Sequence, residues 1–132
     1  MFARLALAAF LLAHAAIHAG FLSRPPVTAG GPAWPFSLDT SWLLHSIDPE
    51  LRRLVGVALV AATIGGFGLA ALGAFGIMAG WAWPVGVALG AVASLATLVL
   101  FFHPWLILGV VIDVVLLWAA LIARWEPAAL AS

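Results

Sequence analysis

The sequence has no cysteine, no lysine and no tyrosine among its 132 residues. The absence of cysteine excludes disulfide bonds, thiolate metal sites and Cys-X-X-Cys redox chemistry. The absence of tyrosine excludes a tyrosyl radical or a phenolic proton relay, and the absence of lysine excludes a Schiff base. The net charge is zero and there is no basic tract, so we expect no nucleic-acid partner.

Apolar residues make up most of the chain. They account for 66% of the residues and charged residues for 8%, with a mean hydropathy of +1.22. Soluble domains contain about 25% charged and 45–50% apolar residues. This composition predicts an integral membrane protein whose first partner is the lipid bilayer. The length suits a single domain over residues 1–132.

The pattern of apolar stretches predicts an all-α fold, a polytopic protein with four transmembrane helices in a compact bundle. Asp48, Pro49 and Glu50 form a strong helix start, and His103-Pro104 interrupts a run that would otherwise form one helix about 60 Å long. We interpret the first stretch as a retained helix and not as a cleaved signal peptide. The predicted spans cover about 5–22, 51–74, 84–102 and 104–123.

Residues 23–48 form the longest polar segment. Its first part is rich in proline and glycine, which cannot continue a helix. Its second part, Asp39 to Ile47, begins with an N-cap residue and has apolar positions at helical spacing. We therefore predict a short helix in the membrane interface, anchored by Trp42.

An even number of spans places both termini on one side of the membrane. Arg4 and Arg124 lie on that side, and Arg24, Arg52 and Arg53 lie on the other. Arg4 at the start of the first span favours termini in the cytoplasm.

Asp113 lies in the middle of the fourth span. A carboxylate at that depth costs roughly 2.5–3.5 kcal/mol on insertion scales, so it should face a partner inside the bundle. His14 and His18 are spaced i, i+4 on one face of the first span. His14 and Asp113 are predicted at depths of about 12 and 14 Å from the same surface, so they can pair. His45 and His103 fall nearer that surface, in the same half of the bilayer.

This cluster supports several kinds of chemistry. His14, His18, Asp113 and His103 are candidate metal ligands, and paired histidines also hold haem iron or relay protons. The alternative is structural: Asp113 and one histidine form a hydrogen-bonded pair that fixes helix register, while His103 caps the fourth helix and His45 is an interfacial residue. No catalytic motif is present, so we predict no catalytic residues and expect no cofactor, with a metal ion or haem as the alternative.

Small residues recur at spacings of three or four on three spans. Such stripes let helices approach closely in lipid. We interpret them as packing within the bundle, with a dimerisation or gating face as the alternative. They comprise Ala9, Ala13, Ala16 and Gly20; Ala62, Gly66 and Ala70; and Gly86, Gly90 and Ser94.

The order of these features resembles small bacterial four-helix integral membrane proteins of unassigned function. The features are the His-X-X-X-His pair of the first span, a Pro/Gly-rich loop, a charged start to the second span and an acidic residue in the last span. The resemblance implies a bacterial inner-membrane protein and no particular reaction.

Our leading hypothesis is a non-enzymatic accessory or structural subunit that works in a homo-oligomer or larger membrane complex. The alternatives are a metal- or haem-binding oxidoreductase or electron carrier, and a transporter subunit that acts as an oligomer.

Overall fold

The computed structural model describes residues 1–23 and 34–131. Four helical segments are long and apolar enough to cross a membrane, with mean hydropathies between 1.9 and 2.6. The predicted all-α, multi-pass architecture is therefore confirmed. The α-helices are α1 (Phe2–His18), α2 (Pro49–Phe75), α3 (Ala82–Leu100) and α4 (Ile107–Leu117).

Shorter helical turns extend these helices. The 3-10 turn η1 (Ala19–Leu22) continues α1, and η2 (Pro104–Leu106) leads into α4. The π-turn η3 (Trp118–Ile122) prolongs α4, so the fourth span covers Pro104–Ile122. A last 3-10 turn, η4 (Pro127–Ala131), lies at the C-terminal end.

The boundaries of α2 follow from local chemistry. The carboxylate of Asp48 accepts hydrogen bonds from the backbone N–H groups of Glu50 and Leu51, at 2.9 and 3.1 Å. Pro49 occupies the first helical position, where no N–H is needed. At the other end, Gly76 has a φ of 81° and closes the helix in the left-handed conformation that favours glycine.

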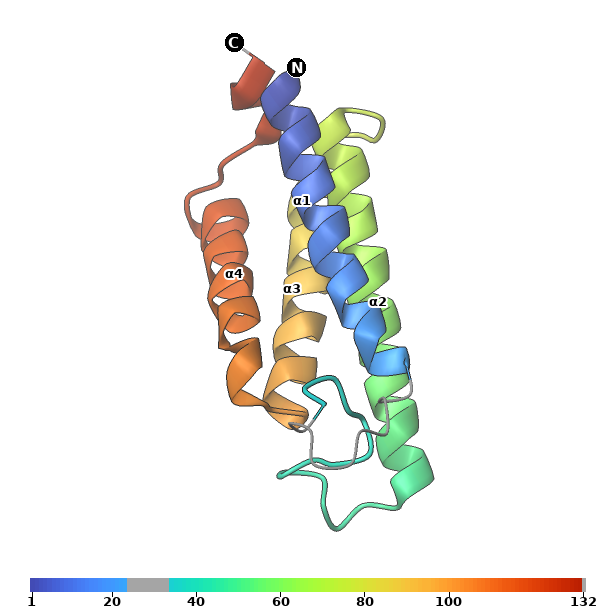
Figure 1. Ribbon diagram of the computed structural model, residues 1–132. Coiled ribbons are helices and arrows are strands. Elements are labelled where there is room, and N and C mark those ends of the chain that lie inside the picture. The colour runs from blue at the N-terminus through green and yellow to red at the C-terminus, as the bar shows by residue number, and fades with distance from the viewer. Residues whose placement is uncertain (24–33, 132) are drawn as a thin grey trace.

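The helices lie roughly along one direction, with both termini at one end of the molecule (Figure 1). Residues 34–48 and the start of α4 lie at the opposite end, as the predicted topology requires. Neighbouring helices pack against each other in chain order: α1 against α2, α2 against α3, and α3 against α4.

At the α2–α3 interface the backbones of the two helices are in direct contact. A Cβ atom added to Gly66 would overlap the backbone of Gly90, and one added to Gly86 would overlap that of Ala70. The small-residue stripes of these two helices therefore pack inside the bundle, as predicted.

The corresponding prediction for α1 is wrong. Ala9, Ala13 and Ala16 are exposed on the outer face of the helix. The buried face carries Ala8, Leu11 and Ala15, along with His14 and His18. The polar histidines lose more by facing lipid than alanine does, so they determine which face of α1 turns inward.

The predicted interfacial helix is also absent from the described residues, because 34–48 forms bends and one turn. Hydrogen bonds from side chains take the place of the backbone hydrogen bonds of a helix. Ser41 Oγ donates to the carbonyl of Leu100, and the indole N–H of Trp42 donates to the carbonyl of Val99 at 2.6 Å. The Ser41 oxygen also accepts from the backbone N–H of Leu44. These bonds tie the segment to the end of α3 and compete with a helix. The Pro/Gly-rich part, 24–33, lies outside the described residues.

Two apolar clusters form the core. The larger one lies toward the termini and includes Leu11, Phe67 and Trp83, and the smaller one lies toward the loop end and includes Val60 and Leu98. Along α2, α3 and α4 the buried polar side chains fall between these two clusters, as does His18 on α1, whereas His14 lies beside Ala15 of the larger cluster.

Candidate functional site

Asp113 is the centre of a buried group of polar side chains from three helices. Its side chain is completely inaccessible. Oδ1 lies 3.0 Å from Nε2 of His14 on α1, and Oδ2 is hydrogen-bonded to the hydroxyl of Ser94 on α3. The carboxylate of α4 thus has a partner on each of two other helices.

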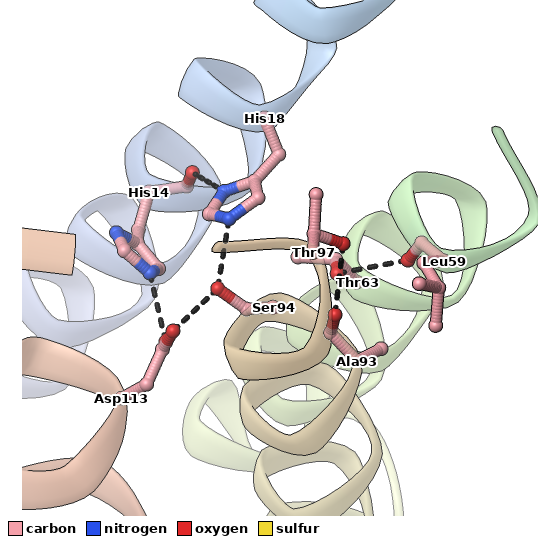
Figure 2. A network of polar contacts seen from close by, with 8 residues as sticks. All are labelled: His14, His18, Leu59, Thr63, Ala93, Ser94, Thr97 and Asp113. Carbon is pink, nitrogen blue, oxygen red and sulfur yellow. Dashed lines mark hydrogen bonds and ion pairs between the residues drawn. The ribbon is translucent and has the colours of Figure 1, made fainter. Parts of the chain in front are cut away.

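His18 completes the group. Its Nδ1 lies 3.1 Å from the backbone carbonyl of His14, one turn earlier on α1, and its Nε2 lies 2.7 Å from Ser94 Oγ. Figure 2 shows the continuous chain of contacts from His18 through Ser94 and Asp113 to His14. We refer to His14, His18, Ser94 and Asp113 as the polar network.

Apolar and aromatic side chains enclose the polar network. The rings of Phe67 and His14 meet in a T-shaped arrangement with 5.1 Å between their centroids, and the two histidine rings meet at the same distance. His14 and His18 are 5% and 2% exposed. In such a dry environment hydrogen bonds are strong, and each unpaired polar group is costly.

The hydrogen bonds restrict where protons can sit. His18 Nδ1 must donate, because its partner is a carbonyl. Ser94 has one proton, so it donates either to Asp113 or to His18. A buried net charge is unfavourable in a membrane interior, so the relevant arrangements have zero net charge.

Two such arrangements satisfy every bond. In the first, His18 is an imidazolium that donates to Ser94, and Ser94 donates to an ionised Asp113. In the second, Asp113 is protonated and donates to Ser94, while Ser94 donates to a neutral His18. The two differ by a proton shift along His18–Ser94–Asp113. In both, His14 donates to Asp113 through Nε2.

The structure brings together three of the four predicted site residues. The predicted pairing of His14 with Asp113 is confirmed, and His18 joins them through Ser94. His103 makes different contacts: its Nδ1 accepts from the backbone N–H of Trp105 at 3.3 Å, as a cap at the start of η2. The interfacial His45 has its Nδ1 3.0 Å from the carbonyl of Trp42.

Metal ligation by these residues stays a prediction. Within residues 1–23 and 34–131, no group of three or more His, Cys, Asp or Glu side chains is arranged to hold a metal ion. The Nε2 atoms of His14 and His18 already lie at hydrogen-bond distance from Asp113 and Ser94. A metal bound through both Nε2 atoms would have to displace these bonds.

Ser94 is the member of the polar network that sequence reasoning missed. Its position in a small-residue stripe predicted only helix packing. Depth is the signal that identifies it. The third span is predicted to end near residue 102, which places Ser94 about 12 Å from the loop-side surface, close to the predicted depth of Asp113 at about 14 Å. Thr63 and Thr97 do bond to their own helices, at the carbonyls of Leu59 and Ala93 (Figure 2).

Comparison with known proteins does not assign the chain to a family. No protein-family profile, curated protein or solved structure matches it. The arrangement of the chain's own residues therefore carries the functional argument.

Proposed function

We propose that this protein is a non-enzymatic accessory subunit of a membrane assembly, and that the polar network is a structural lock that joins α4 to α1 and α3. The observation that carries this proposal is the pairing within the network. Asp113 uses both carboxylate oxygens, Ser94 uses its hydroxyl and His18 uses both ring nitrogens in bonds between or within helices. Such pairing suits a fixed connection.

The surface of α4 supports association with a partner. In the fourth span only 22% of an 18-residue window is buried inside the protein, against 50% in the third. The fourth span is therefore the least buried of the four, and its outer face is a surface that a second copy or another membrane protein can cover. Its exposed apolar side chains are Ile107, Leu108, Val111, Val114, Val115, Trp118, Leu121 and Ile122.

Cross-linking through α4 tests this role, and the cysteine-free sequence makes it direct. Val111→Cys on α4 and Leu12→Cys on the outer face of α1 are 53% and 51% exposed, so they form a matched pair. A photoactivatable maleimide on Val111→Cys should give an adduct larger than the monomer in native membranes. Mass spectrometry identifies the captured chain as a second copy or a different subunit. Monomer alone at position 111, or the same adducts from both positions, would contradict the proposal.

The same preparation distinguishes the alternatives. A metal- or haem-binding oxidoreductase should contain one metal ion or haem per chain, visible by elemental analysis or a Soret band. Its loss in a folded His14→Ala, His18→Ala double variant would replace the accessory role with this one. A transporter subunit should instead support ion flux in vesicles that depends on Asp113.

We further propose a bacterial inner membrane as the location, with the termini in the cytoplasm. Arg4 at the start of the first span supports this orientation. It lies beside the end of α2, where its Nε donates to the carbonyl of Ala74 at 2.8 Å.

A further inference from the structure

A cavity lies directly beside the polar network. Its volume is about 150 Å³, and its wall includes His14, Ile17, Leu98, Leu108 and Gly109. These residues come from α1, α3 and α4, so the cavity sits at the seam where α4 approaches α1. It is smaller than the 300–1,000 Å³ of typical pockets for drug-sized ligands.

The mouth of this cavity faces the bilayer. Ile17 and Leu108 are 54% and 66% exposed, and both lie within spans that are long enough to cross the membrane. Exposed side chains at this depth contact lipid, so the cavity opens sideways between α1 and α4. A molecule dissolved in the membrane can enter it without crossing water.

One nitrogen of His14 is available to such a molecule. Nε2 is bonded to Asp113, whereas Nδ1 has no hydrogen-bond partner in the described part of the chain. His14 Nδ1 is also not sealed from the surface of the protein. Because the His14 ring forms part of the cavity wall, Nδ1 is a polar atom that a bound molecule can reach.

The polar network determines the hydrogen-bonding role of this nitrogen. In both neutral proton arrangements, His14 donates through Nε2, so Nδ1 carries a lone pair and accepts. A ligand must therefore supply an O–H or N–H donor. A charged donor is disfavoured because the walls are mostly apolar and the entrance is in lipid.

Size and wall chemistry narrow the ligand further. A protein cavity of about 150 Å³ accommodates one benzene ring. Phe21, Phe36 and Trp105 contribute aromatic surface to the wall. We propose that this cavity binds a membrane-soluble phenol, with its ring between α1 and α4, its hydroxyl donating to His14 Nδ1 and any longer substituent leaving through the mouth. The binding test uses this chain alone, so its outcome does not depend on whether a partner covers α4.

Fluorine NMR of the full chain in phosphatidylcholine nanodiscs tests this proposal. 4-Fluorophenol and fluorobenzene have rings of the same size and differ in the hydroxyl. We expect saturable binding of 4-fluorophenol, about three- to tenfold tighter than fluorobenzene, as one hydrogen bond between neutral groups provides. The ¹⁵N signal of His14 Nδ1 should shift on binding, while those of His45 and His103 should not.

Variants at the cavity wall and on the outer face of α4 separate this cavity from other sites. Gly109→Val places a side chain against Leu98 at the cavity wall, where an added Cβ already comes within 3.0 Å of Leu98 Cδ1. It should abolish saturable binding, whereas Val111→Leu, on the exposed side of the same helix, should retain it. If Gly109→Val does not fold, Ile17→Trp narrows the mouth from the lipid side and should weaken binding.

Three results would overturn the proposal. Absence of saturable 4-fluorophenol binding would show that the cavity does not take a phenol. Equal affinity for fluorobenzene would show that His14 does not accept a hydrogen bond from the ligand. Undiminished binding in a folded cavity-blocking variant would place the phenol elsewhere.

Discussion

Replacing Asp113 with leucine removes the centre of the polar network. His14 and Ser94 then each lose a hydrogen-bond partner at a site with no access to water. Hydrogen bonds measured within membranes average about 0.6 kcal/mol each and reach about 1.7. Loss of two such bonds predicts that the free energy of unfolding falls by about 1–3 kcal/mol.

The greater hydrophobicity of leucine does not offset this loss. It favours insertion of α4 by roughly 3 kcal/mol on insertion scales, but this gain applies equally when the inserted helices are packed and when they are apart. Asp113→Asn retains one carbonyl acceptor, so we expect it to lose about half as much stability as Asp113→Leu.

Reversible unfolding in mixed detergent micelles, followed by tryptophan fluorescence and circular dichroism, measures these differences. Val114→Leu is the matched control, because it adds leucine at the next position of α4, where the side chain is 52% exposed. A double-mutant cycle of Asp113→Leu with Ser94→Ala should show coupling above about 0.5 kcal/mol, since the two residues share a bond. Equal or greater stability of Asp113→Leu would refute the structural role of the carboxylate.

Two further predictions concern topology and packing. In sealed vesicles, His45→Cys and His103→Cys should react with a membrane-impermeant maleimide from the same side, because both residues lie at the loop end of the bundle; labelling from opposite sides would contradict the four-span topology. Gly66→Ala should lower the thermal unfolding temperature strongly, because its Cβ would overlap the backbone of Gly90, whereas Gly65→Ala, whose Cβ meets nothing within 4 Å, should not. Equal unfolding temperatures would show that α2 and α3 are less closely packed.

The four spans were predictable because lipid leaves the backbone few alternatives. An apolar segment that crosses the membrane must satisfy its N–H and C=O groups internally, so length and hydropathy alone indicate a helix. The start of α2 was equally predictable from the sequence, because the Asp48 cap and Pro49 are adjacent and both act on the first turn of the helix. These signals are local, and the structure confirms them.

The contact of His14 with Asp113 was predictable from depth, because a regular helix converts residue number into distance along the membrane normal. The fold of residues 34–48 was not. The bonds of Ser41 and Trp42 go to carbonyls at the end of α3, more than 50 positions away in sequence. The helix propensity of residues 39–47 contains no information about these distant carbonyl groups.

The orientation of α1 shows another limit. Small residues such as Ala13 permit close approach of two helices but do not require it, whereas His14 and His18 gain strongly from a polar partner. Counting small residues therefore predicted the buried face of α1 incorrectly. On α2 and α3 the buried polar residues Thr63, Ser94 and Thr97 lie on the same face as the small residues, so both signals agree.

The backbone contact between α2 and α3 has a consequence for how the chain assembles. These helices are joined by a short turn, Gly76–Trp81, and their fit depends on Gly66, Gly86 and Gly90, which carry no side chains to arrange. Contacts close in sequence form fastest, so this hairpin can form as soon as both helices are inserted. By contrast, the bond between His14 and Asp113 joins residues 99 positions apart and must wait for the last span. The α2–α3 hairpin can therefore assemble first, and the polar network forms only after α4 has been inserted.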